Sequence, residues 1–347
     1  MKNNVIKLAG LFIVGSAIFL AVFSFVGWEK IISAISQLYI PLYIAFIGLS
    51  VLDIFVWSSK WGIFVRKDHP HVSHLDLVKN LLVGMAMNYL TPVFKAGGEP
   101  ARIYLLKKKN NVRGREGLAT VTSDLTMEFI IDGILVLLAM IFFLIFFSPP
   151  LWIYGVLAIF ILMSSVIVFG LVGIYTGRKI FYKLIEWVCG RVKRLEGYEK
   201  KIKDAYETFR ENFRGIMSDR KLFVKGLLLT VFRKVIILSK YYILFVALGY
   251  EISPVVILIF IGIGYMLMMV PATPGSLGVF EGGMVSVFVL LGVPAGISAT
   301  MVFLDRLVWF WGILAVGGSL GVYYGVDFLE SKELSFLDED VYPGKKG

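Results

Sequence analysis

The sequence has one cysteine, few charged residues and no motif of soluble enzyme chemistry. The single cysteine, Cys189, excludes a disulfide within the chain. A Walker A motif is absent, which argues against ATP-driven export by this chain alone. The sequence also has no Ser/His/Asp catalytic order, no cluster of metal ligands and no soluble catalytic domain. We therefore expect a protein that is not an enzyme and that uses no cofactor or metal.

Long apolar runs take the place of these motifs. Hydrophobic residues make up 58% of the 347 residues and charged residues only 17%. A run of about 20 apolar residues is long enough to cross the roughly 30 Å hydrocarbon layer of a membrane. The runs predict an all-α polytopic membrane protein with about six full transmembrane helices. The predicted spans are 8–27, 40–58, 117–147, 151–175, 223–248 and 296–325.

The first span has two interpretations, a cleaved signal peptide or a retained helix. Its apolar run exceeds the roughly 7–15 residues of a signal peptide, and the bulky end FSFVGW lacks a small-x-small cleavage site. We expect a retained helix.

Basic residues predict the orientation of the spans. The net charge of +10 would suggest nucleic acid as a partner of a soluble protein, but in a membrane protein the positive-inside rule accounts for it. Basic residues gather between the second and third spans and again between the fourth and fifth, and the opposite loops have almost none. We therefore expect a multi-pass protein of the cell membrane with both termini in the cytoplasm and no nucleic-acid partner. The first basic group comprises Lys60, Arg66, Lys67, Lys79, Lys95, Arg102, Lys107, Lys108, Lys109, Arg113 and Arg115.

Two further apolar regions, 76–106 and 254–291, are interrupted near their middles. The first is broken at TPVFKAGGEP and the second at PATPGSLG. The charged flanks place both ends of the first region in the cytoplasm and both ends of the second outside. Irregular backbone at membrane depth must be buried in protein or face a watery cavity, because lipid cannot hydrogen-bond it. We therefore predict two re-entrant helical hairpins.

The two broken regions share a spacing of polar residues. In each, a Thr-Pro pair is followed seven residues after the proline by a glutamate, and then by an aspartate 25 or 24 positions further on. With opposite entry sides, the regions form an inverted repeat, of about 76–147 and 254–325, as is frequent in transporters. The residues concerned are Thr91, Pro92, Glu99 and Asp124 in the first unit, and Thr273, Pro274, Glu281 and Asp305 in the second.

These same segments carry a family resemblance. NYLTPVFKAGGEPARIYLLKKK (88–109), with ATVTSDLTMEFIIDG (119–133), resembles the first half of the lysylphosphatidylglycerol-synthase transmembrane-region family. PATPGSLGVFEGGMVSVFVLLG (271–292) resembles its second half. In the multiple-peptide-resistance enzymes this domain moves aminoacylated phosphatidylglycerol between leaflets, and a separate soluble domain makes that lipid. About twenty residues follow the last span here, so the resemblance implies the flippase-like half only, with a separate lipid-modifying enzyme as a partner.

Glu99 and Glu281 are the first candidate site residues. An ionisable group at bilayer depth is costly, by about 2.5–3.5 kcal/mol on insertion scales, and usually has both a partner and a role. Each glutamate could cap or brace the second helix of its hairpin. Alternatively, each could bind a cationic headgroup or titrate during a transport cycle.

Asp124, Glu128 and Asp132 are spaced four residues apart and therefore share one face of the third span. They could line a passage for a headgroup. The alternative is that they form ion pairs with cations of the fifth and sixth spans. Those cations are Arg233, Lys234, Lys240 and Arg306.

Arg233 and Lys240 are seven residues apart and lie on one face of the fifth span. A guanidinium matches a phosphate bidentately and an ammonium adds a compact charge. The pair therefore predicts a phosphate subsite for a lipid headgroup. Arg306 and its neighbour Asp305 could instead form a structural pair.

Glycines and prolines mark both hairpin breaks. The glycines allow close backbone approach, and the half-helices that follow would present free N–H groups to an anion. The alternative is that they form tight turns only. These residues are Pro92, Gly97, Gly98, Pro271, Pro274, Gly275 and Gly278.

Outside the repeat, the linker 177–222 mixes basic and apolar residues at helical spacing, which predicts amphipathic helices on the cytoplasmic membrane surface. The tail 328–347 is polar. Gly317, Gly321 and Gly325 form a small-xxx-small ridge, which predicts close packing within the monomer, with a homodimer as the alternative.

The leading hypothesis is a single flippase-like domain (1–327) that moves a phospholipid or lipid-linked headgroup between leaflets through a polar cavity between the hairpins. Membrane lipids, with anionic headgroups favoured, are the expected partners. The alternative is an integral-membrane transferase or hydrolase that acts on a lipid-linked phosphate or sugar.

Overall fold

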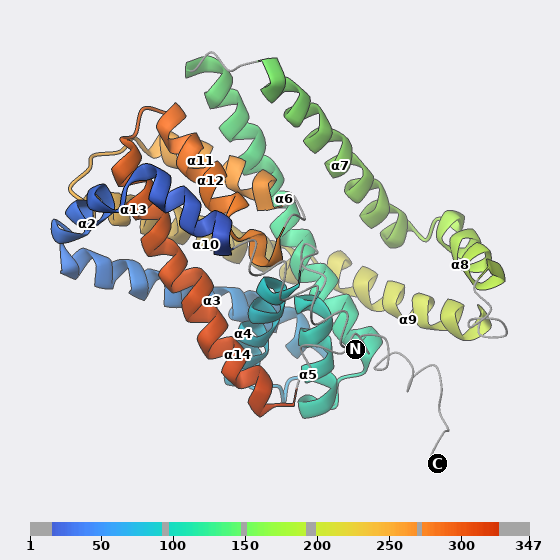
Figure 1. Cartoon of the computed structure of the whole chain (residues 1–347). Helices are drawn as coiled ribbons and strands as arrows, with labels where there is room; N and C mark the ends of the chain where they lie inside the picture. Colours follow the sequence, from blue (N-terminus) through green and yellow to red (C-terminus); the bar gives the residue numbers. More distant parts are fainter. Residues whose placement is uncertain (1–15, 92–96, 147–150, 192–198, 269–272, 326–347) are drawn as a thin grey trace.

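The computed structural model describes residues 16–91, 97–146, 151–191, 199–268 and 273–325 (Figure 1). Every regular element in this part of the chain is helical, which confirms the all-α polytopic class. After a helix at Ser16–Val26 the elements are α2 (Trp28–Ser36), α3 (Ile40–Asp68), α4 (His74–Leu90), α5 (Gly98–Asn110), α6 (Gly114–Phe146), α7 (Leu151–Thr176), α8 (Lys179–Arg191), α9 (Glu199–Ser218), α10 (Arg220–Ala247), α11 (Pro254–Met268), η2 (Pro274–Ser276), α12 (Val279–Leu290), α13 (Ala295–Arg306), η3 (Leu307–Gly312) and α14 (Ile313–Tyr323).

Three helices of the described chain are long and apolar enough to cross a membrane, and up to five are if each of two bent pairs counts as one span. The three are α3, α6 and the continuous α13–η3–α14, and the bends follow Val26 and Thr176. Helix α10, predicted as the fifth span, is not among them, because Arg233, Lys234 and Lys240 lie close together near its middle. All three cations are buried. The charges that lower the hydropathy of α10 are therefore enclosed by protein.

Both interrupted regions fold as pairs of helices. Helix α5 runs back along α4, where Gly98 N–H donates to Asn88 Oδ1 at 2.8 Å. Helix α12 runs back along α11, where the rings of Phe260 and Phe288 stack with centroids 4.0 Å apart. The predicted hairpins are therefore present as helix pairs. The residues at their tips, 92–96 and 269–272, include Pro92 and Pro271 and lie outside the described residues.

The long helix of each predicted unit packs against the hairpin of the other. Helix α14 packs on α4, where Gly317 lies so close that an added Cβ would be 2.2 Å from Leu82 O. Helix α6 packs on α11, where a Cβ on Gly262 would be 2.5 Å from Ala139 Cβ. This exchange is the contact pattern expected of two related halves, and the opposite orientation of the halves in the membrane stays a prediction. Gly317 is also used within the chain, in line with the monomer packing expected of the glycine ridge.

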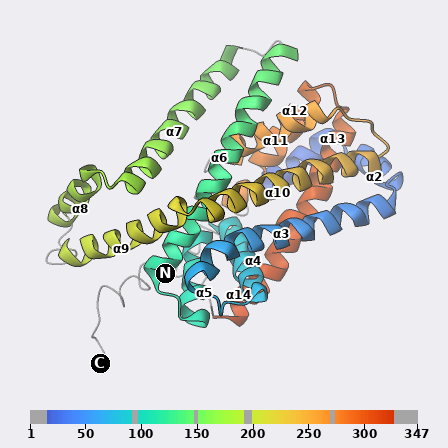
Figure 2. The ribbon, with the colours of Figure 1, turned by 180° about the vertical axis from the view of Figure 1, so that it is seen from behind.

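The pairing of α3 with α10 extends the same relationship by one helix (Figure 2). One half therefore comprises α3–α6 and the other α10–α14. Local signals start these helices, since Ser73 Oγ accepts from Asp76 N at the start of α4 and Asp219 caps α10. A left-handed Asn111 ends α5.

Helices α7, α8 and α9 form an arm on one side of the two halves (Figures 1 and 2). Helix α9 packs on α6, and Phe209, Phe213 and Ile216 on its apolar face are buried. The apolar face of α9 is therefore covered by protein, and the position of the linker 177–222 at the membrane surface stays a prediction. Helix α8 leaves Leu184 and Trp187 exposed, as an amphipathic surface helix would.

Candidate functional site

A polar cavity of about 580 Å³ lies between the two halves. Residues of α3, α4, α6, α10, α11, η2, α12, α13 and η3 line it, together with Ile167 and Leu171 of α7. Its ionisable lining contains four acids and four bases, so the formal charges balance. They are Asp53, Glu128, Asp132 and Asp305, with Arg233, Lys234, Lys240 and Arg306.

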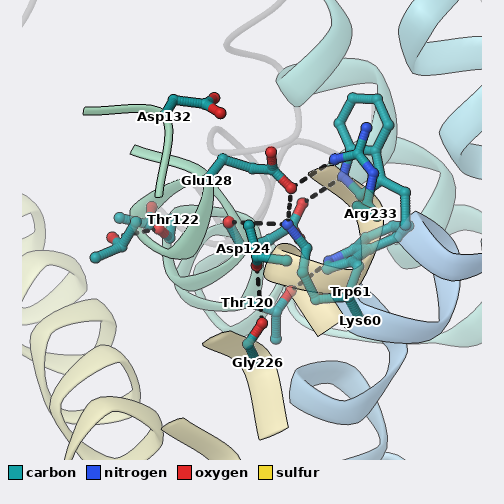
Figure 3. Close-up of polar contacts among 12 residues, drawn as sticks. Lys60, Trp61, Thr120, Thr122, Asp124, Glu128, Asp132, Gly226 and Arg233 are labelled. Carbon is teal, nitrogen blue, oxygen red and sulfur yellow. Dashed lines mark hydrogen bonds and ion pairs between the residues drawn. The ribbon is translucent and has the colours of Figure 1, made fainter. Parts of the chain in front are cut away.

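Glu128 is the centre of a buried ion-pair network on α6 (Figure 3). Its Oε1 accepts from Arg233 Nη1 at 2.5 Å and from Lys60, and its Oε2 accepts from Lys234 Nζ at 2.7 Å. Arg233 also donates from Nε to Asp53 Oδ1 at 2.6 Å. The guanidinium of Arg233 is thus already directed at two carboxylates of the protein.

Asp132 lies one turn above Glu128 on the same face, at the edge of this network (Figure 3). Lys234 Nζ lies 2.6 Å from Asp132 Oδ1, and the Asp132 side chain remains 25% exposed. Lys234 also donates to Tyr265 Oη at 3.1 Å. Asp132 is therefore the acid of the Asp124, Glu128 and Asp132 series that is most open to the cavity.

Asp124 lies on the far side of the network and does not line the cavity. Its carboxylate pairs with Lys60 Nζ at 3.0 Å and Arg102 Nη2 at 2.9 Å, and it accepts from Trp57 Nε1 at 3.1 Å. The ion pairs predicted for this series are therefore found for Glu128 and Asp132, whereas Asp124 uses two cations from α3 and α5. Because Lys60 and Arg102 are buried in these pairs, they no longer count among the basic residues that indicate a cytoplasmic loop.

A second, smaller charge cluster lies in the other half. Lys240 Nζ is 3.7 Å from Asp305 Oδ1 and stands 4.0 Å from the centroid of the Trp309 ring. Arg306 Nε is 2.6 Å from Glu281 Oε1, and Arg306 Nη2 is buried without a hydrogen-bond partner among the described residues. Both cations line the cavity. A π-helical turn, a feature frequent at functional sites, follows Arg306 directly.

Glu281 is fully buried behind Arg306 and does not line the cavity. It lies in the first turn of α12, accepts from Gly278 N–H and thereby caps the helix. The structure thus places Glu281 in the bracing role that we considered for it. Glu99 lies in the first turn of α5, half-buried and likewise outside the cavity lining.

One glycine N–H at each hairpin break is already occupied. Gly278 N–H donates to Glu281, and Gly98 N–H donates to Asn88. These two groups are therefore not free to bind an anion. Gly275 has a φ of 60° and Gly278 a φ of 85°, conformations that favour glycine. Gly98 fits against α4 because an added Cβ would lie 2.3 Å from Gly84 O. Gly97 precedes α5 as its N-terminal cap residue, and Pro274 begins η2.

Asp53, Lys60 and Arg102 also belong to the network, and they were not predicted from the sequence. One signal could have found two of them, because Asp53 and Lys60 are seven residues apart on α3, as Arg233 and Lys240 are on α10. The structure relates the lysines further, since Lys60 pairs with Asp124 as Lys240 pairs with Asp305. Each half therefore joins a lysine before its hairpin to the aspartate after it.

Comparison with known proteins places the chain in a lipid-related family of membrane proteins. Residues 7–317 match the family described as Lysylphosphatidylglycerol synthase TM region. A UPF0104 membrane protein of Methanothermobacter thermautotrophicus is 28% identical over 291 residues, which cover 82% of this chain and 86% of the relative. UPF0104 membrane proteins of Pyrococcus horikoshii and Methanocaldococcus jannaschii are each 24% identical and cover 89% of this chain, with 95% and 92% of their own lengths matched. No solved structure matches the chain significantly.

Proposed function

Because the chain belongs to the lysylphosphatidylglycerol synthase TM region family, we propose that it moves a lipid between membrane leaflets, with the lipid headgroup in the polar cavity. The observation that carries the proposal is the cavity between the two halves, lined by four acids and four bases. A buried lining of both signs suits a headgroup that itself carries a phosphate and a polar or cationic group. Charged residues within a membrane domain are costly and usually mark a path for substrate or ions.

The phosphate subsite is best assigned to Lys240 and Arg306. Arg233, the residue first expected there, is held by Asp53 and Glu128 at 2.6 and 2.5 Å, and a phosphate would have to displace both. Lys240 has a 3.7 Å ion pair, and Arg306 Nη2 has no hydrogen-bond partner among the described residues. These two cations can donate hydrogen bonds to phosphate oxygens without the loss of a short ion pair.

The acid that suits the rest of the headgroup is Asp132, the most exposed carboxylate of the Glu128 network. A cationic headgroup could replace Lys234 as its partner, and Lys234 would retain Glu128 at 2.7 Å. A headgroup of both signs would then span the cavity from the Lys240 cluster to Asp132. The buried charges would exchange ion pairs between protein and lipid. They would then stay compensated as the cavity opens first to one side of the membrane and then to the other.

The test has two steps. Native mass spectrometry of the purified protein identifies the co-purified lipid, and a leaflet-translocation assay in liposomes follows with that lipid. Translocation without chemical change supports the proposal. Failure to move any co-purified lipid contradicts it, and chemical turnover of the lipid would favour the transferase or hydrolase alternative.

A further inference from the structure

A second cavity, of about 810 Å³, lies between α6 and α7. The residues that line it follow one stripe on each helix, at three- and four-residue spacing. All are apolar or glycine except Thr126, Ser164 and Ser165. The stripes are Thr126, Phe129, Ile130, Gly133, Ile134 and Leu137 on α6, and Ile161, Ser164, Ser165, Val168, Phe169, Leu171 and Val172 on α7.

This α6–α7 groove is continuous with the polar cavity. Thr126, Phe129, Gly133 and Leu171 line both spaces. Gly133 lies next to Asp132, the open acid of the polar cavity, and a Cβ added at Gly133 would meet no atom within 4 Å. The two spaces therefore meet beside Asp132, where the lining changes from charged to apolar.

The shape of the joined space matches an amphipathic molecule. At 1.5 Å per residue, the α6 stripe from Thr126 to Leu137 is about 16 Å long, roughly half the hydrocarbon layer. Beyond the junction, many side chains of α7 are exposed, including Val168 and Phe169. Among the described residues that line the groove, the only polar groups are three hydroxyls and none is charged, so the lining suits an acyl chain that enters from the bilayer.

We propose that the α6–α7 groove holds an acyl chain of the lipid whose headgroup occupies the polar cavity, with Gly133 at the junction of the two parts. This rests on the proposed function for its ligand, a membrane lipid with a phosphate headgroup. The protein thus binds part of the hydrophobic tail as well as the headgroup, and the lipid enters from the side between α6 and α7.

Photo-crosslinking tests the groove directly. The probe is phosphatidylglycerol or phosphatidylethanolamine with a diazirine in one acyl chain. It is added to phosphatidylcholine liposomes that contain the protein. Adducts are mapped by mass spectrometry. We expect at least fivefold more adducts on the α6 and α7 stripes than on the exposed α10 positions Leu228 and Val231. In Gly133→Trp, this excess of adducts on the stripes should be lost. Equal labelling of α10 and the groove, unchanged by Gly133→Trp, would show bulk lipid only and overturn the proposal.

Translocation of the same lipids provides the second readout. Gly133→Trp should slow translocation at least tenfold, because the indole fills the junction. Ser165→Trp, on the α7 stripe and outside the lining of the polar cavity, should also slow translocation, yet leave binding of the deacylated compounds glycerophosphoglycerol or glycerophosphoethanolamine unchanged. Gly48→Trp, at an exposed glycine of α3 with no neighbour within 4 Å, should resemble the wild type. Wild-type rates in Gly133→Trp would refute the groove. A wild-type protein that moves no lipid but still crosslinks selectively along the groove would refute transport and leave the groove intact.

Discussion

Lys240 Nζ lies 3.7 Å from Asp305 Oδ1, farther than in any other ion pair between buried residues of the described chain. The equivalent pair in the first half, Lys60 and Asp124, is 3.0 Å apart. Lys60 is enclosed by protein, whereas Lys240 faces the cavity. The two related pairs therefore have different surroundings: the first is short and enclosed, and the second is longer and lines the cavity.

The Glu128 network predicts that two carboxylates one turn apart differ strongly in their effect on stability. Glu128→Gln leaves Lys60, Arg233 and Lys234 without their shared carboxylate, and loss of one partner from a buried ion pair destabilises by about 3–5 kcal/mol. Asp132→Asn should have less than half this effect, because its side chain is 25% exposed. Thermal or denaturant unfolding in detergent measures both variants. Equal destabilisation would contradict the central position of Glu128.

The contact between α14 and α4 predicts opposite effects at adjacent glycines. An added Cβ at Gly317 would lie 2.2 Å from Leu82 O, whereas one at Gly318 would meet nothing within 4 Å. Gly317→Ala should therefore destabilise by about 1–3 kcal/mol through overpacking. Gly318→Ala should be neutral or stabilising by up to about 1 kcal/mol through helix propensity. The two melting temperatures, measured in the same detergent, provide the comparison, and equal values would count against the packing of the two halves.

The sequence was sufficient to predict the helical class, the paired helices at both breaks and the family. The helical class and the paired helices follow from long apolar runs and from glycines and prolines, whose effects are local. The family follows from the resemblance of the segments around the two breaks. The shared spacing of Glu99 and Asp124 with Glu281 and Asp305 also pointed to two related units. The exchange of long helices between those units agrees with that prediction.

The distribution of roles among the charges could not be predicted from the sequence. Lys60 follows the predicted end of its span and was assigned to a loop, but α3 continues to Asp68 and buries it. Glu281 lies in an apolar segment of the sequence, as the other candidate residues do. In the structure it caps α12 and pairs with Arg306 outside the cavity lining. The rotation of each helix and its contacts with helices distant in the sequence determine which cations face the cavity. Local sequence patterns indicate neither.

The cap formed by Glu281 predicts a graded series. Glu281→Gln keeps an oxygen that can accept from Gly278 N–H but loses the charge that pairs with Arg306. Glu281→Ala loses both contacts and leaves Arg306 buried without its partner carboxylate. We expect the order of stability to be wild type, then Gln, then Ala, with the last step about 0.5–2 kcal/mol for the lost cap. Unfolding in detergent checks this order, and an alanine variant as stable as the glutamine variant would rule out the cap.

A pH effect is expected in the arm formed by α8 and α9. Glu207 accepts hydrogen bonds from Arg210 and from Tyr182 of α8, and the bond from Arg210 holds the pKa of the Glu207 carboxyl below its usual value of 4.5. A lowered pKa means that this contact stabilises the arm fully above pH 4.5 and is lost as the pH falls through the lowered value. Protease cleavage between α8 and α9 should therefore increase below pH 4.5 in the wild type, and Glu207→Gln should remove that pH dependence. A pH dependence retained in Glu207→Gln would assign it to another group.

Lys240→Gln in the translocation assay tests the assignment of the headgroup site most directly. The assay uses the co-purified lipid in liposomes and compares this variant with Arg113→Gln, which removes a cation whose side chain is 71% exposed. We predict that Lys240→Gln translocates at least tenfold more slowly at a temperature at which it remains folded, and that Arg113→Gln matches the wild type. Wild-type translocation by a folded Lys240→Gln protein would contradict the assignment of the headgroup phosphate to this cavity.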